Sequence, residues 1–143
     1  MTFAGINYLA VVLAAVAAWV AGAAWYGALA KPWVAAQGYT MDEFKARQEA
    51  MRGSPAGYAP FIIAFVAELI MAWMLAGIVG HLGQVTLRNA VISAAFVWFG
   101  FVLTTLAVNY AFGARGVKLA AIDAGHWLLV LLVEGAVIGA MGV

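Results

Sequence analysis

Four apolar runs, each long enough to cross a lipid bilayer, dominate this sequence. They cover approximately residues 7–29, 58–82, 86–112 and 119–142. A membrane-spanning helix needs about 20 mostly apolar residues, and these runs are too long and too evenly apolar to be strands. We therefore predict an all-α integral membrane protein, in which residues 1–143 form one domain and four transmembrane helices pack as a compact bundle.

The composition excludes most soluble classes of protein. Of the 143 residues, 67% are hydrophobic and 9% are charged, whereas about a quarter of a soluble domain is charged. A fold of this size could not hide so much apolar surface from water. The net charge of +1 argues against a nucleic-acid partner. The absence of cysteine excludes disulfides, thiol catalysis and cysteine-based metal sites.

The first run also resembles a signal peptide, because Ala-Gly-Ala-Ala at 21–24 looks like a cleavage site. However, no Lys or Arg precedes the run, and the run is longer than a normal signal core. We therefore expect it to be a retained helix.

The distribution of basic residues predicts the orientation. Cytoplasmic loops of membrane proteins carry an excess of Lys and Arg. The first and third loops carry six of the seven basic residues, and the opposite side carries only Arg88. We expect a bacterial inner-membrane protein with both termini outside and loops one and three in the cytoplasm. The six residues are Lys31, Lys45, Arg47, Arg52, Arg115 and Lys118.

Loop one, residues 31–57, is the longest polar segment. Thr40 and Glu43 have the spacing of a capping box, and Gly53 is a typical helix stop. We predict a short amphipathic helix that lies on the cytoplasmic membrane surface. The alternatives are a plain connection between two spans and a partner-binding or gating element. The residues at helical spacing are Met41, Phe44, Gln48 and Met51.

Four ionisable residues interrupt the apolar runs: Glu68, Asp123, His126 and Glu134. A charge in hydrocarbon is costly, so such residues usually face a protein interior or a watered cavity. At about 1.5 Å per residue, Glu68 lies near the midplane and Glu134 in the outer half. Asp123 and His126 lie within about 10 Å of the cytoplasmic end. We therefore expect more than one site.

The cytoplasmic end gathers most of the polar side chains. Six residues at this depth form a candidate polar or substrate site between the third and fourth runs: Tyr26, Asn109, Tyr110, Arg115, Asp123 and His126. The alternative for His126 is a core histidine that is hydrogen-bonded to Asp123 or Asn109.

Neither Glu68 nor Glu134 has a Lys or Arg at its own depth. Glu68 is a candidate midplane proton site, because an unpaired carboxyl group in low dielectric readily exists in its neutral form. The alternative is a structural, protonated glutamate whose plausible hydrogen-bond partners are Thr104, Thr105 and tryptophan side chains. Glu134 is an outer-half carboxylate that a long Arg88 side chain could reach.

Two stripes of small residues allow helices to approach closely. One is Ala14, Ala18 and Gly22, and the other is Gly135 and Gly139. They predict either tight packing within one bundle or a dimer seam. Because a chain of 15.0 kDa leaves little room for an internal cavity, we expect a homodimer.

The sequence predicts no cofactor and no metal. The two histidines, His81 and His126, lie toward opposite ends of their helices, which argues against a bis-histidine haem. Zinc would need more ligands than the neighbourhood supplies. No nucleophile–base pair is visible, so we predict no catalytic residues, and an enzyme is the least favoured class.

Several short motifs together resemble a known family. They are Ile6-Asn-Tyr-Leu-Ala-Val, Trp25-Tyr26, and Asn109-Tyr-x-Phe-x-x-Arg115-x-x-Lys118-Leu leading into Ile122-x-x-Gly125. This pattern resembles the bacterial membrane proteins grouped as domain of unknown function 1761. The resemblance implies a four-helix membrane fold with no established activity. It also implies that Asn109, Tyr110, Arg115, Lys118 and Gly125 are shared, while Asp123, His126 and Glu134 depart from the family pattern.

Two functions compete at this stage. The first is transport or permeation of a small solute or ion, with the polar site near the cytoplasmic side and Glu68 as a proton or cation site. The second is a non-catalytic membrane module that binds a lipid or a partner membrane protein through loop one and the small-residue faces.

Overall fold

The computed structural model describes residues 5–143, which form helices joined by short turns. Four helical segments are long and apolar enough to cross a membrane: α1, α4, the composite α5–η1–α6 and α7. Their ends differ from the predicted ranges by at most three residues. The elements are α1 (Tyr8–Ala28), α2 (Ala30–Ala36), α3 (Met41–Met51), α4 (Pro55–His81), α5 (Leu87–Val97), the π-helix η1 (Trp98–Leu103), α6 (Thr104–Phe112) and α7 (Val117–Met141).

Side-chain caps define where several helices begin. The Asn7 side chain accepts a hydrogen bond from the backbone N–H of Ala10 at 3.1 Å, which caps α1. Thr86 caps α5 in the same way, through the N–H of Asn89 at 3.2 Å. Such caps satisfy amide groups that the first helical turn leaves unpaired. Pro55 occupies the first turn of α4, where its missing N–H costs nothing.

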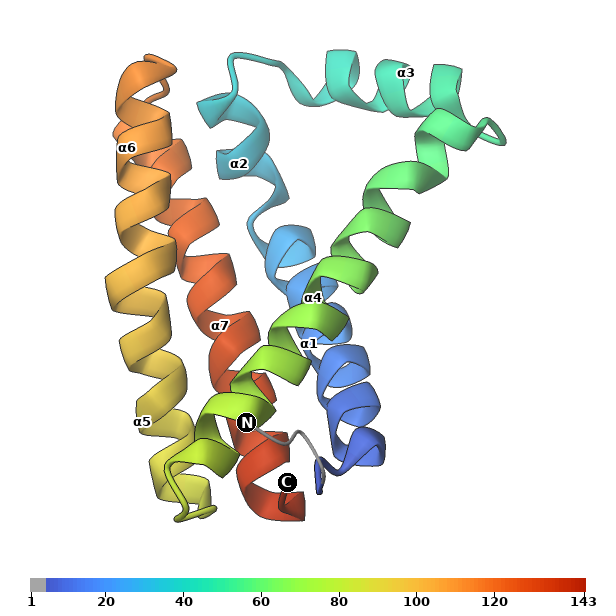
Figure 1. Ribbon diagram of the computed structural model, residues 1–143. Helices are drawn as coiled ribbons and strands as arrows, with labels where there is room; N and C mark the ends of the chain where they lie inside the picture. Colours follow the sequence, from blue (N-terminus) through green and yellow to red (C-terminus); the bar gives the residue numbers. More distant parts are fainter. Residues whose placement is uncertain (1–4) are drawn as a thin grey trace.

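Loop one holds one more helix than the sequence analysis predicted. After a break at Leu29, α2 continues the chain in nearly the direction of α1, and a turn then leads into α3 (Figure 1). The predicted capping box of α3 is present between Thr40 and Glu43. The left-handed backbone of Gly53, with φ of +76°, follows α3 and leads into α4.

Helix α7 occupies the centre of the molecule. It packs against α1 on one side and α5 on the other, while α4 crosses α1 and α7 at a steep angle (Figure 1). The start of α1 and the end of α7 lie at one end of the molecule. Helix α3 lies across the opposite end, nearly perpendicular to the long helices.

The small-residue stripes are used inside the chain. A Cβ atom on Gly135 would lie 2.9 Å from the Ala90 carbonyl oxygen, and one on Gly139 would lie 2.7 Å from the Leu87 Cα. Ala14 and Ala18 on α1 are fully buried. These stripes therefore pack the bundle, and they are not free to form a dimer seam.

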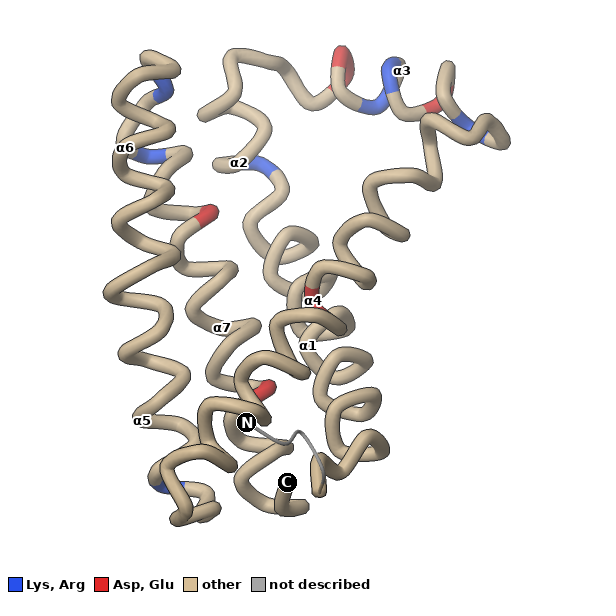
Figure 2. The backbone as a smooth tube through the Cα atoms, in the orientation of Figure 1, with Lys and Arg blue, Asp and Glu red and all other residues tan. Residues whose placement is uncertain are grey.

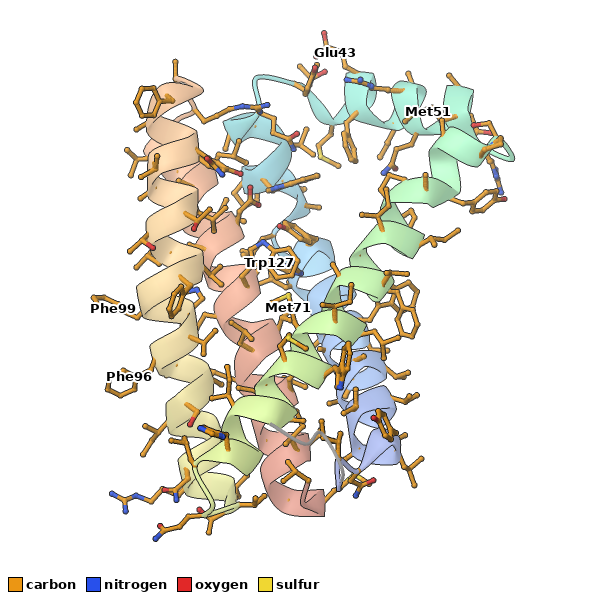
Figure 3. The ribbon with its side chains drawn as sticks, viewed as in Figure 1. Glu43, Met51, Met71, Phe96, Phe99 and Trp127 are labelled. Carbon is orange, nitrogen blue, oxygen red and sulfur yellow. The ribbon has the colours of Figure 1, made fainter. Side chains whose placement is uncertain are left out.

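Large apolar side chains point away from the bundle along the third long helix. Phe96 is 74% exposed and Phe99 is 66% exposed, and both project outward from α5 and η1 (Figure 3). Apolar surface on this scale marks contact with a partner or with lipid.

Candidate functional site

The carboxylate of Asp123, near the start of α7, gathers three hydrogen-bond donors from three other elements. The Tyr26 hydroxyl of α1 donates to Oδ1 at 2.8 Å, and the Trp33 indole N–H of α2 donates to the same oxygen at 3.0 Å. The Tyr110 hydroxyl of α6 donates to Oδ2. A partly buried charge needs such partners, because a carboxylate removed from water without them is very costly. Asp123 therefore ties four helices together.

Sequence spacing explains how two of these donors meet. Tyr26 lies in the last turn of α1, and Trp33 follows seven residues later on α2. Seven residues make nearly two helical turns, so both side chains lie on the same side when the chain direction changes little. Their rings are 5.0 Å apart.

Two further tryptophans hold α7 beside its neighbours. The Trp25 indole N–H donates to the Ile122 carbonyl at 3.1 Å, and that of Trp98 donates to the Ala124 carbonyl at 2.8 Å. Gly125 makes room for Trp25, since a Cβ atom there would lie 2.7 Å from the indole ring. Trp98 begins the π-helix, and such widened turns often occur at functional sites.

His126 lies behind this network and is buried. Its ring centroid lies 4.6 Å from that of Tyr26 and 4.9 Å from that of Trp127, and the Trp127 ring is nearly perpendicular to it. Its Nδ1 has no hydrogen-bond partner among residues 5–143. The alternative prediction of a hydrogen bond from His126 to Asp123 or Asn109 is therefore wrong at this nitrogen. The His126 ring instead packs against the ring of Tyr26, whose hydroxyl donates to Asp123.

A cleft of about 370 Å³ opens beside Asp123, between α2 and the adjoining ends of α6 and α7. Arg115 lies on its wall and has no carboxylate within ion-pair distance among residues 5–143, where the salt bridge found is Arg52–Glu49. The residues that line the cleft are Trp33, Gln37, Asn109, Tyr110, Gly113, Arg115, Leu119 and Asp123.

The structure brings the predicted cytoplasmic residues together in two layers. Tyr26, Tyr110 and Asp123 share hydrogen bonds, and His126 packs behind them. Asn109 and Arg115 line the cleft with Tyr110 and Asp123. Depth along straight helices was sufficient to group these six residues.

Sequence reasoning missed three participants. Trp33, which the sequence analysis does not single out, donates to Asp123. Gln37 lines the cleft, and Trp98 contacts the α7 backbone. The seven-residue spacing of Tyr26 and Trp33 could have identified the first. The roles of Gln37 and Trp98 depend on the course of α2 and on the π-helix, which composition does not reveal.

Glu68 and Glu134 form a second polar feature, on α4 and α7. They are 1% and 0% exposed. The Thr104 hydroxyl, one of the expected partners of Glu68, donates instead to the Gly100 carbonyl at 2.8 Å. That Glu68 lies near the midplane and Glu134 in the outer half stays a prediction. The depth argument assumed upright helices, whereas α4 leans across the bundle (Figure 1).

The comparisons with known proteins give a family but no function. No curated protein and no solved structure matches the chain. The family described as "Protein of unknown function (DUF1761)" matches residues 9–139, which is nearly the whole length, and the chain therefore belongs to that family.

Proposed function

We propose that this chain is an integral membrane protein whose cleft beside Asp123 binds a small solute with an anionic group, as the cytoplasmic entry site for transport or permeation. One observation carries this proposal. The charge of Asp123 is satisfied by three donors from within the chain, whereas Arg115 on the same cleft has no acidic partner among the described residues.

The membrane placement is supported by the four apolar helices and by the outward phenylalanines. Figure 2 shows most basic residues at the end that carries α2 and α3. Arg88 lies in the first turn of α5, at the other end. By the positive-inside rule, the cleft end is cytoplasmic and the termini are outside. In a bacterial cell this corresponds to the inner membrane.

Helix α3 fits a position on the cytoplasmic membrane surface. Met41, Phe44 and Met51 are partly buried, and the other residues of α3 are exposed. Glu43 points away from the bundle (Figure 3). The Phe44 ring meets Trp33 edge-on at 5.8 Å, so α3 also supports a wall of the cleft. An amphipathic helix with basic residues on its polar side suits an anionic membrane surface.

The chemistry of the cleft favours an anion. A guanidinium group offers five N–H donors in a fork that matches a carboxylate or phosphate. The amide side chains of Gln37 and Asn109 line the same cleft and add further donors. A volume of about 370 Å³ lies in the range of small-molecule sites.

The test is anion binding by the full chain in nanodiscs without anionic lipid. Isothermal titration with phosphate and with small carboxylates should show binding that Arg115→Gln weakens about tenfold or more, because hydrogen bonds to charged groups contribute about 1.5–3 kcal/mol. Arg88→Gln, at the opposite end, is the matched control and should bind like the wild type. Absence of binding to every tested anion, or an equal loss in Arg88→Gln, would contradict the proposal.

The alternative is a non-catalytic module that holds an anionic lipid headgroup. Lys118, close in sequence to Arg115, favours this, because basic pockets at the cytoplasmic side of helices bind such headgroups. Nanodiscs with and without phosphatidylglycerol separate the two sources of the anion, and a flux assay in proteoliposomes asks whether a bound solute moves. Lipid binding that depends on Arg115, without solute flux, would favour the module. A homodimer remains part of either proposal, with an interface outside the glycine stripes.

A further inference from the structure

We propose that the cleft beside Asp123 selects a zwitterion, in which Arg115 binds the carboxylate or phosphate and Asp123 binds a primary ammonium group. The inference rests on the proposed function, because it names the class of solute that the same cleft takes. Arg115 and Asp123 both line this cleft, which has a volume of about 370 Å³. Two opposite charges on one small cleft match a solute that carries both.

The three hydrogen bonds to Asp123 do not cancel its charge. Their donors are two tyrosine hydroxyls and one indole N–H, all of which are neutral groups. Among residues 5–143 no basic side chain lies within ion-pair distance of Asp123, since the salt bridge found there joins Arg52 to Glu49. The carboxylate is therefore held in place while its negative charge remains free to attract a ligand.

Asp123 also retains hydrogen-bonding capacity. An ionised carboxylate has about four acceptor positions, shared equally by its two oxygens. Oδ1 receives the Tyr26 and Trp33 donors, whereas Oδ2 receives Tyr110 alone among the described residues. An ammonium group carries three N–H donors. A ligand in the cleft can therefore fill the remaining position on Oδ2 and neutralise the charge at the same time.

Tyr110 links the two charges of the cleft. Its hydroxyl donates to Asp123, and its backbone carbonyl accepts the N–H of Arg115 at 2.9 Å. Between Tyr110 and Arg115 the chain turns at Ala114, whose backbone is left-handed with φ of +49°. This turn brings Arg115 to the same cleft, yet Arg115 forms no ion pair with Asp123. A ligand can bridge the two charges, which the fold keeps apart.

The same charges disfavour other solutes. A simple anion on Arg115 would bring a second negative charge to the cleft beside Asp123, and adjacent like charges are costly. A trimethylammonium group has no N–H for Oδ2 and needs open aromatic faces. The Trp33 ring on this cleft already contacts the rings of Tyr26 and Phe44, at centroid distances of 5.0 and 5.8 Å. A primary ammonium therefore fits better than a quaternary one.

The test compares matched ligands on the full chain in nanodiscs of digalactosyldiacylglycerol, a lipid with neither charge nor ammonium group. Isothermal titration near neutral pH measures each amino compound against the anion that lacks only its ammonium. The pairs are glycine and acetate, β-alanine and propionate, γ-aminobutyrate and butyrate, and phosphoethanolamine and ethyl phosphate. At least one amino compound should bind about tenfold or more tightly than its partner, because it gains a hydrogen bond between charged groups. The N-trimethyl form of that compound should lose the gain.

Variants assign each charge to its part of the ligand. Asp123→Asn should lower the affinity for the amino compound to that for its matched anion, and should strengthen anion binding because the like charge is gone. Arg115→Gln should weaken both members of the pair. Glu49→Gln alters an exposed carboxylate on α3 and is the matched control, which should bind both as the wild type does. Circular dichroism checks folding, and the wild-type comparison decides the matter if Asp123→Asn does not fold.

Added lipid identifies the source of the zwitterion. Phosphatidylethanolamine in the same nanodiscs should compete with the free amino compound if the cleft takes a lipid headgroup. It should leave that binding unchanged if the cleft takes a free solute. Either result supports the inference and separates the two sources of the same chemistry.

Two results would overturn the inference. One is that no amino compound binds more tightly than its matched anion while both depend on Arg115, which would leave the proposed function standing. The other is a preference for the amino compound that persists in Asp123→Asn, which would mean that another group binds the ammonium. Absence of binding by both members of every pair would contradict the proposed function as well.

Discussion

Asp123 and Glu134 lie on the same helix, yet their carboxyl groups differ in hydrogen-bond partners and in burial. Asp123 receives donors from α1, α2 and α6 and borders an open cleft. Glu134 is fully buried, and neither of its oxygens has a partner among the described residues. The first arrangement holds a charge in place and the second favours a proton. The surroundings of an acid inside a membrane helix, more than its presence, therefore indicate its role.

The largest effect should follow from removing the satisfied carboxylate. We expect Asp123→Ala to lower the free energy of unfolding by about 3–5 kcal/mol, because three donors lose a charged acceptor together. Tyr110→Phe, which removes one donor, should cost about 1.5–3 kcal/mol. Reversible unfolding in mixed micelles, followed by circular dichroism, measures both. If Asp123→Ala lowers the free energy of unfolding no more than Tyr110→Phe does, the carboxylate does not hold the three donors together as described.

Next in size are glycine substitutions near the two carboxyl groups. A Cβ on Gly135 would press against the Ala90 backbone at 2.9 Å, whereas one on Gly22 would meet the His126 side chain at 2.6 Å. Backbone cannot yield as a side chain can. We expect Gly135→Ala to destabilise by about 1–2 kcal/mol, since overpacking of about 1–3 kcal/mol exceeds the gain in helix propensity.

Gly22→Ala should cost less, and it should move the His126 ring away from Tyr26. Unfolding measurements give the costs, and the His126 ring chemical shifts report its movement. Equal costs for the two variants would show that the α5–α7 contact yields as readily as the histidine does.

The sequence was sufficient to predict the helices and the end of the molecule where polar groups gather. Hydrocarbon-length runs leave little choice of secondary structure, and depth along a helix follows from residue number. The course of α2 and the lean of α4 were not predictable in this way (Figure 1). They depend on how side chains pack between helices, which the composition of each helix does not reveal.

A smaller effect should follow from replacing the unsatisfied acid with an apolar residue of similar length. We expect Glu134→Met to change the free energy of unfolding by less than about 1 kcal/mol, or to stabilise the fold, because no hydrogen bond from a described residue is lost and an unpaired polar group is removed. The same unfolding assay measures it. A loss as large as that of Asp123→Ala would mean that Glu134 makes an interaction equivalent to the Asp123 network.

The smallest effect concerns Glu43, an exposed carboxylate that has donors but no burial. Its side chain accepts hydrogen bonds from the backbone N–H and the hydroxyl of Thr40, at 2.8 and 2.9 Å. These bonds, the backbone bond first, hold the pKa of Glu43 below its ordinary value of 4.5. A carboxyl whose pKa is lowered by folding stabilises the folded helix above its unfolded pKa, and this contribution is lost as the pH falls through the folded value.

We therefore expect the first turn of α3 to fray as the pH is lowered from about 6 to about 3, while the Asp123 end of the bundle stays intact. Backbone chemical shifts of residues 40–44 measure the fraying. Glu43→Gln is the matched control, because glutamine keeps the capping geometry without a titrating group, so its first turn should not respond to pH. An unchanged pH response in Glu43→Gln would assign the effect to another acid on α3, such as Asp42 or Glu49. In that case the hydrogen bonds to the exposed Glu43 carboxylate would have no measurable effect on the stability of α3. Burial would then be what distinguishes Asp123 from an ordinary surface carboxylate.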